Sequence, residues 1–505
     1  MELPILWPGF TYKPHQIAGV NWLLSREKKT PSGGIVCDEM GLGKTIQLLA
    51  LLKAEQKTDT LLIGPVAVLS QWEEAATRSG ITVLRPATTV RHREWKIQGK
   101  FRPFAPKIYL IGYEMARSSP QFLTIVEWTR IICDEAHRLA SKSSALSSMV
   151  SGIRAPKKWF LTATPIINSI KDIVNLLTLV GLKPSTNPAE ILPLVNEYVM
   201  ARSMAAMRNT VGVEAPPAPE IHRQVLPFLS EDEADFYRGM TGAIVKRWKA
   251  LEDEVGGANG LLKLKLFMRL RQLSLHPQVY IDARNAGNTA APRPPWTGTS
   301  TKFDAIQSLL KGDLKLGDLK LGDMKPNKWI IFCHFHSEME LLKKTLETLP
   351  YVGKVHMYNG TLSAAERKEV IAATHEPSQA TDILLIQLQS GGVGLNLQHF
   401  NRVIFSGPWW TSALMEQAIG RAVRIGQKEV VHVYHLILKE EDALNIDRYM
   451  TDKADQKGSL CREILSAAWH KAEPTPVASA GINPPPPPPG ASAGINPPPP
   501  PPAGQ

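Results

Sequence analysis

The chain of 505 residues carries a net charge of +11, and 43% of its residues are hydrophobic. This is ordinary globular composition, with length for more than one domain. No apolar run reaches the roughly 18 residues of a membrane span, and the N-terminus lacks the basic start and cleavage site of a secretory signal. We therefore expect an intracellular protein without a membrane partner, and the basic surplus weakly favours a polyanion as partner.

Short apolar runs rich in β-branched residues recur along the chain in two series, and each run is followed by a loop and a helical pattern. Such alternation is typical of parallel sheets covered on both faces. Two series predict two α/β domains. The first series lies at 33–38, 60–66, 107–113, 130–136 and 158–164, and the second at 328–335, 354–360, 382–388, 402–407 and 430–438.

The region between the two series has a different character. Residues 186–280 are mainly helical in pattern, and 285–300 form a Pro/Gly/Thr-rich linker. The repeated GDLKL that begins at residue 312 predicts an expanded surface loop. The proline-rich repeat after residue 477 predicts a disordered tail that serves as a spacer or as a ligand for a proline-binding module. We therefore expect two α/β domains at 1–185 and 301–440, joined by helical insertions and a linker at 186–300. A bracing helix at 441–471 and the disordered tail at 472–505 follow.

The stretch "VCDEMGLGKTIQ" (36–47) ends like a phosphate-binding loop. An apolar strand precedes it, Gly41 and Gly43 supply a flexible turn, and a helix begins at Lys44. Backbone N–H groups of such a loop face phosphates, Lys44 would neutralise the β- and γ-phosphate charge, and Thr45 would hold Mg²⁺. However, Asp38 stands where the pattern G-x-x-x-x-G-K-[ST] has its first glycine.

A second signal is "RIICDEAH" (130–137), an apolar strand that ends in two carboxylates. Asp134 can complete the Mg²⁺ shell, and Glu135 can polarise the attacking water. A third signal is "EQAIGRAVRIGQ" (416–427), in which Arg421 and Arg424 share a helix face. Either arginine could reach across a cleft to the transferring phosphoryl group. An acidic turn and a solvated basic helix are the alternatives for the two motifs taken singly.

Together these motifs resemble the Swi/Snf-family ATPases of helicase superfamily two, over about residues 10–440. In that family the phosphate loop normally begins with Asp, so Asp38 fits the pattern. The resemblance implies two tandem RecA-like lobes with helical insertions, and ATP in the cleft between them. It rests on the segments 12–24, 38–47, 61–75, 110–117, 130–137, 161–168, 270–277, 358–371, 388–410 and 417–427.

The resemblance also implies roles for single residues. Gln16 would contact adenine, and the loop residues Asp38, Met40, Gly41, Leu42, Gly43, Lys44 and Thr45 would bind the nucleotide. Thr45 and Asp134 would hold Mg²⁺, and Glu135, Arg421 and Arg424 would be catalytic. Contacts to the DNA backbone are expected from Ser70, Thr164, Gly360, Thr361, Gly391 and Gly392.

The implied function is ATP hydrolysis coupled to translocation on double-stranded DNA in the nucleus of a cell or of a virus-infected host, where it remodels nucleosomes or other protein–DNA complexes. Trp410 and other variants lean toward the Rad-type repair branch, although four cysteines are too few for the RING insertion of many of its members. Two interpretations stay open beside it: a strand-separating DNA or RNA helicase, and a non-catalytic DNA-binding scaffold.

Overall fold

The computed structural model describes residues 2–55, 58–88, 93–99, 102–124, 126–208, 215–253, 260–287, 291–312, 328–391 and 395–469. The chain divides into two compact units, Met1–Glu473 and Pro474–Gln505. The predicted disordered tail, nearly all of the GDLKL repeats and Gly392 lie outside the described residues. None of the described helices has the combination of length and hydropathy that crossing a membrane requires.

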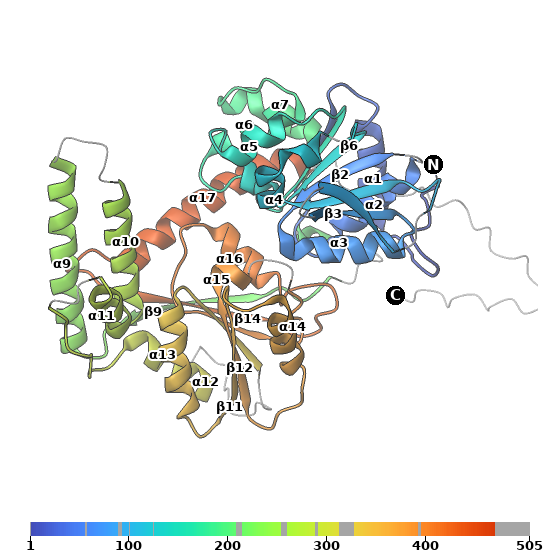
Figure 1. Cartoon of the computed structure of the whole chain (residues 1–505). Coiled ribbons are helices and arrows are strands. Elements are labelled where there is room, and N and C mark those ends of the chain that lie inside the picture. The colour runs from blue at the N-terminus through green and yellow to red at the C-terminus, as the bar shows by residue number, and fades with distance from the viewer. Residues whose placement is uncertain are drawn as a thin grey trace, which may run out of the picture. The chain divides into compact units, whose positions relative to one another are not determined.

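The first sheet has eight strands in the order β4-β3-β5-β2-β6-β7-β1-β8, and the first lobe is built around it. Successive strand residues point to opposite faces, so Leu61 and Ile63 join one buried core and Leu62 joins the other. Helices α1 to α3 cover the face of Leu62, and α4 to α6 cover the other (Figure 1). The strands are β1 (Ser32–Val36), β2 (Asp59–Gly64), β3 (Thr82–Thr88), β4 (Arg93–Gln98), β5 (Lys107–Gly112), β6 (Arg130–Asp134), β7 (Lys157–Leu161) and β8 (Val199–Met200).

The second sheet is wholly parallel, in the order β11-β12-β10-β13-β14-β9, and the second lobe is built around it. It follows the same rule, since Ile331 faces the core under α12 and α13 while Ile330 faces the core under α16. The two predicted α/β domains and all ten predicted strands are therefore confirmed. The strands are β9 (Glu220–Pro227), β10 (Lys328–Cys333), β11 (Val352–Tyr358), β12 (Thr381–Gln387), β13 (Arg402–Phe405) and β14 (His432–Lys439).

The region expected to be mainly helical also contains two strands. β8 closes the first sheet beside β1, and β9 closes the second sheet beside β14. The first lobe thus extends past the expected boundary at residue 185, and the second sheet includes a strand from the segment 186–300. β8 is only two residues long, and the exposed sequence of β9 has little of the apolar character by which a strand is recognised.

One long helix takes part in both lobes. The first part of α17 (Ile446–Trp469) places Ile446 and Met450 in a cluster with α9, α10 and α11, and its last turns place Ile464 and Leu465 in the first-lobe core. The other helices are α1 (Pro14–Arg26), α2 (Lys44–Ala54), α3 (Val66–Arg78), α4 (Tyr113–Ser118), α5 (Ala145–Ser151), α6 (Ile170–Val180), α7 (Pro188–Tyr198), α8 (Met204–Met207), α9 (Glu231–Asp253), α10 (Gly260–Leu275), α11 (Pro277–Asn285), α12 (Thr301–Lys311), α13 (His336–Glu347), α14 (Ala364–Ala373), α15 (Leu388–Gly391) and α16 (Ser412–Ile419), with short 3₁₀ turns at Pro120–Leu123 and Ala136–Leu139.

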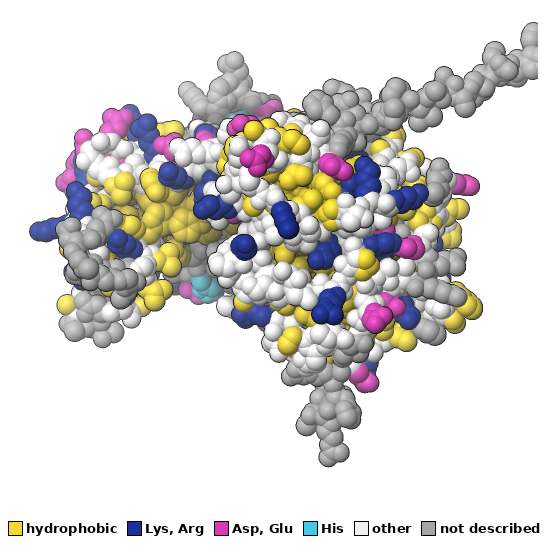
Figure 2. Space-filling model, turned by 90° about the horizontal axis from the view of Figure 1, so that it is seen from above, with side chains coloured by type: hydrophobic (Ala, Val, Ile, Leu, Met, Phe, Trp, Pro, Cys, Tyr) yellow, Lys and Arg dark blue, Asp and Glu magenta, His cyan; other side chains and the backbone are white. Residues whose placement is uncertain are grey.

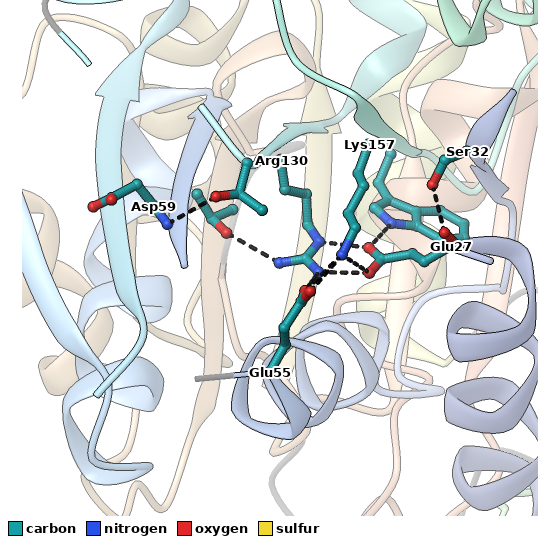
Figure 3. A network of polar contacts seen from close by, with 9 residues as sticks. Glu27, Ser32, Glu55, Asp59, Arg130 and Lys157 are labelled. Atoms are coloured by element: carbon teal, nitrogen blue, oxygen red, sulfur yellow. Dashed lines mark hydrogen bonds and ion pairs between the residues drawn. The ribbon is translucent and has the colours of Figure 1, made fainter. Parts of the chain in front are cut away.

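A network of charged side chains lies at the beginning of β6 and β7 (Figure 3). The fully buried Arg130 donates two hydrogen bonds to Glu27, at 2.5 and 2.6 Å, and one to Glu55 at 2.8 Å. Lys157 lies 3.1 Å from Glu27 and 2.6 Å from Glu55, and the Trp159 indole donates to Glu27 at 2.9 Å. Burial raises the pKa of Glu27, but the hydrogen bond and charge of Arg130 outweigh it and hold that pKa below its ordinary value.

We expect Arg130→Ala to lower the free energy of unfolding by about 3–5 kcal/mol, because it leaves a buried carboxylate without its main partner. The matched control is Lys354→Ala, whose ion pair with Glu376 is exposed and contributes little to stability because solvent screens it. Urea unfolding of both variants measures the difference, and equal losses would contradict the account.

Candidate active site

The glycine-rich loop between β1 and α2 requires its glycines. Gly41 and Gly43 have φ angles of +88° and +84°, the left-handed region that side chains disfavour. A Cβ at Gly43 would lie 2.6 Å from the side-chain nitrogen of Gln16. Gln16 therefore packs against the turn immediately before α2, at the place where the helix presents its free N–H groups.

The fully buried Asp38 carboxylate holds the loop rather than facing the cleft. It accepts hydrogen bonds from both Arg202 nitrogens, Nε at 2.9 Å and Nη2, and from Gln47 Nε2 at 3.0 Å. Burial raises the pKa of Asp38, but Arg202 and Gln47 more than offset this and lower it. The sequence grouped Asp38 with the nucleotide contacts. The structure gives its oxygens to partners within the first lobe, so its role there is to shape the loop.

The remaining loop residues divide between the core and the cleft. Leu42 is buried in a small cluster with Met204 and Met207. Lys44 Nζ donates to the backbone carbonyl of Asp38 at 2.6 Å and is half-buried, as is Thr45 on the first turn of α2. These two side chains stand at the N-terminus of α2, where a phosphate and its counter-ion are favoured.

The two carboxylates at the end of β6, Asp134 and Glu135, lie in different environments. Asp134 ends the strand and accepts hydrogen bonds from the Trp72 indole at 2.7 Å and from the backbone N–H of Glu135 at 2.8 Å. Glu135 has φ +50° and ψ +49°, and it is the one residue other than glycine with positive φ in the described part of the chain. Such strain costs on the order of 1–3 kcal/mol and clusters at active sites. Its carboxylate lies 3.3 Å from His137 Nδ1.

The pKa values of this pair are driven apart. Burial, and then the charge of Glu135, raise the pKa of Asp134. Burial also raises the pKa of Glu135, but the hydrogen bond from His137, followed by the charges of His137, Lys44 and Arg421, holds it below its ordinary value. As the pH rises, Glu135 therefore loses its proton before Asp134 does.

Two arginines from the second lobe complete the site. Burial lowers the pKa of Arg421 to about 10, although the nearby charges of Glu135 and Asp134 oppose that shift. Arg424 lies against the glycine loop, because its Cγ is 3.5 Å from the place where a Cβ at Gly41 would stand. Met40 packs in the same way against Gly420. The structure thus brings the loop, the two carboxylates and both arginines together.

A cavity of about 540 Å³ lies beside this site and shares Met40, Arg202 and Gly420 with it. Its mainly apolar lining includes Cys37, Thr164, Val423 and Cys461, and it includes none of the lysine, carboxylate or Arg421 groups described above. Thr164 is only 6% exposed. The side chain lines the cavity, so contact with DNA would require it to become exposed, and the expected contact of Thr164 stays a prediction.

The other predicted DNA contacts lie on loops and helix ends. Ser70 on α3 is exposed, as are Gly360 and Thr361 at the end of β11. The Gly360 carbonyl accepts from Arg367 at 2.9 Å, and Thr361 donates to the Asn359 side chain at 2.7 Å. Gly391 ends α15, and its expected neighbour in this role, Gly392, lies outside the described residues.

Three side chains that support the site were not singled out from the sequence. Arg202 contacts Asp38 across 164 residues, and Trp72 contacts Asp134 across 62 residues. No local pattern reports such pairs. His137 is different, because it stands two residues after Glu135 in the same motif and could have been chosen from the sequence.

Comparison with known proteins gives two family matches. Residues 15–195 match the SNF2-related domain, and residues 302–426 match the helicase conserved C-terminal domain. The glycine loop and the carboxylates lie in the first match, and Arg421 and Arg424 lie in the second. Together the two matches cover more than half of the chain.

Several proteins have sequences that align with most of this chain. A probable global transactivator of Orgyia pseudotsugata multicapsid polyhedrosis virus is 26% identical, over 89% of this chain and 91% of its own length. The ISWI chromatin-remodeling complex ATPase ISW2 of Saccharomyces cerevisiae is 26% identical, over 92% of this chain and 42% of its own length. The probable ATP-dependent DNA helicase CHR12 of Arabidopsis thaliana is 27% identical, over 92% and 43%. The chain spans less than half of the latter two.

A solved structure, the Sulfolobus solfataricus SWI2/SNF2 ATPase core in complex with dsDNA, is 21% identical with a TM-score of 0.39, and the match covers 93% of this chain and 99% of that one. The leaning toward the Rad-type branch stays a prediction. By its two domains, their order and its relatives, the chain belongs to the Swi/Snf family of DNA-dependent ATPases.

Proposed function

We propose that this protein hydrolyses ATP with Mg²⁺ and uses the energy to move along double-stranded DNA. The observation that carries the proposal is the meeting of groups from both lobes at one place. The glycine loop and the anionic Glu135 belong to the first lobe, and Arg421 beside them belongs to the second. When a site is assembled from two lobes, hydrolysis of the nucleotide can change the position of one lobe relative to the other.

Each side chain has a part in this proposal. Lys44 and the N–H groups at the start of α2 hold the phosphates, and Thr45 and Asp134 fit a Mg²⁺ ion because they offer oxygen ligands. Bound Mg²⁺ supplies charge neutralisation. Glu135, kept ionised by His137, accepts the proton of the attacking water. Arg421 meets charge that develops on the transferring phosphoryl group.

Coupling to movement rests on helix α17. Its two ends belong to different cores, and Lys457 near its middle donates to Asn168 of the first lobe at 3.1 Å. When the lobes close on ATP, α17 limits how far they move. We propose that this restraint gives a step of fixed size rather than free opening.

Duplex DNA is the proposed track. The net charge is +11, and the Lys and Arg side chains on the face shown in Figure 2 are scattered between neutral and apolar ones. Scattered cations suit contacts to a phosphate backbone, which do not depend on base sequence. Several relatives are named for chromatin remodelling or as DNA helicases. On that basis we propose nucleosomes or other protein–DNA complexes as substrates, and the nucleus as the compartment.

Replacing Glu135 separates binding from chemistry. We expect Glu135→Gln to bind ATP like wild type but to lose hydrolysis, because phosphate contacts remain while water is no longer polarised. Lys44→Ala should lose both. Phosphate release and a fluorescent ATP-binding assay measure the two properties. Wild-type turnover in the Glu135→Gln protein would refute the assignment and favour a non-catalytic scaffold.

Replacing Arg421 tests the contribution of the second lobe. We expect Arg421→Ala to slow hydrolysis by about 10³-fold or more, with a smaller change in ATP affinity, since the arginine meets charge of the transition state. Arg448→Ala, on an exposed part of α17, is the matched control and should hydrolyse normally. A mutant that hydrolyses normally but binds DNA poorly would move Arg421 to the DNA track.

Translocation and strand separation are distinguished on one preparation. We expect ATP-dependent displacement of a third strand from a triplex, without unwinding of a fork, and a DNA affinity that falls steeply with salt because counter-ion release dominates such binding. Efficient fork unwinding without triplex displacement would favour the strand-separating helicase.

A further inference from the structure

The N-terminal ends of the strands β9 and β14 carry two histidines and a glutamate on one face. Within the part of the chain that the structure describes, Glu220, His222 and His432 form the one group of at least three His, Cys, Asp or Glu side chains whose ligand atoms all lie within 4.8 Å of one another. Glu220 and His222 are two residues apart and so point to the same side of β9. The strand register sets His432 opposite Glu220.

The nitrogen atoms that face the carboxylate have no better partner. His432 Nδ1 lies 3.1 Å and His222 Nε2 lies 3.8 Å from Glu220 Oε2. Both nitrogens are buried, and neither makes a hydrogen bond with acceptable geometry among the described residues. The two imidazole rings are stacked, 5.8 Å apart and inclined by 12°. Buried polar atoms are normally satisfied, so this pair calls for a ligand between the rings and the carboxylate.

Two other histidines of the second lobe, His334 and His336, do not share this property, and His356, which also has a buried ring nitrogen without a partner, belongs to no cluster of three ligands among the described residues. His334 uses both ring nitrogens, one 3.1 Å from Arg271 Nη2 and the other 3.0 Å from the Gly407 carbonyl. His336 is half-exposed and has only Glu340, at 3.5 Å. Neither His334 nor His336 has two further ligand side chains beside it. Among the described residues, the group on β9 and β14 is therefore the candidate metal site.

We propose that Glu220, His222 and His432 bind a zinc ion. Two imidazole nitrogens and one carboxylate oxygen are a donor set that Zn²⁺ accepts, with a fourth position left for water. Glu220 is half-exposed, so that position opens to solvent. The ligands must move closer by small side-chain rotations, since zinc–ligand distances are about 2.0–2.2 Å.

A positive neighbour makes the carboxylate essential. Arg402, at the start of β13, is paired in register with His432 and donates to the Tyr434 hydroxyl at 3.4 Å. Its charge opposes a second cation nearby. Glu220 contributes the one negative charge among the three ligands, so its loss should weaken binding as much as loss of a histidine.

The consequence of binding would be mechanical. β9 is the edge strand of the second sheet, most of its residues are half or fully exposed, and it follows the segment that leads out of the first lobe. Zinc would join its first residues to the first residue of β14. The metal would thus fix where the chain enters the second lobe, independently of the nucleotide site.

The test uses untagged full-length protein with excess Mg²⁺, titrated with Zn²⁺ alone in a calorimeter, followed by metal analysis after dialysis. We expect one zinc per chain and a higher melting temperature with zinc. His222→Ala and Glu220→Gln should weaken binding by more than about 10-fold, because even loss of an outer partner of a metal ligand costs that much. His336→Ala is the matched control and should bind like wild type.

Two further readings decide the outcome. Co²⁺ should give the visible absorption of a tetrahedral site in wild type and not in the Glu220→Gln protein. Circular dichroism shows whether each variant is folded, and Glu220→Gln, which keeps its shape, serves if a histidine variant does not fold. The proposal is overturned if wild type binds no zinc, or if folded Glu220→Gln and wild type bind it equally.

Discussion

The close approach of the second lobe to the glycine loop is the constraint on which this site depends. Gly41 has a left-handed backbone and no side chain, and Arg424 lies 3.5 Å from where its Cβ would be. Gly420 leaves room for Met40 in the same way. A methyl group at either glycine would already be in van der Waals contact with the facing lobe, so a longer side chain would have to push the lobes apart. Arg421 would then lose its place beside Glu135, and each group would lose the opposite charge that the other supplies.

Two buried ionic groups hold the first lobe so that this approach is reproducible. Asp38 with Arg202 anchors the loop beside β8, and Arg130 with Glu27 joins the strands at the opposite end of the sheet. Buried pairs contribute little net stability compared with apolar packing, but breaking one is costly. They therefore fix geometry, and the apolar cores on both sheet faces supply the free energy of folding.

The sequence was sufficient for what local patterns encode. Ten strands were found, nine of them as apolar runs in a parallel sheet, while the edge strand β11 is only partly buried. Four strands were missed: β8 is too short, β9 is largely exposed, and the antiparallel pair β3 and β4 has polar residues between its apolar ones. Gly41, Lys44, Asp134 and Arg421 were found because each belongs to a motif of fixed spacing. Partners such as Arg202 depend on tertiary contacts between distant segments, and the burial of Thr164 depends on the cavity beside it, which no spacing reveals.

The central claim is that both lobes together form an ATPase that responds to duplex DNA. The most direct measurement is the rate of ATP hydrolysis with no nucleic acid, single strands, duplex DNA and nucleosomes, side by side on one preparation. The account predicts a low basal rate that rises strongly with duplex DNA and little with single strands. Hydrolysis that is absent under all four conditions, or stimulated by single strands alone, would contradict it.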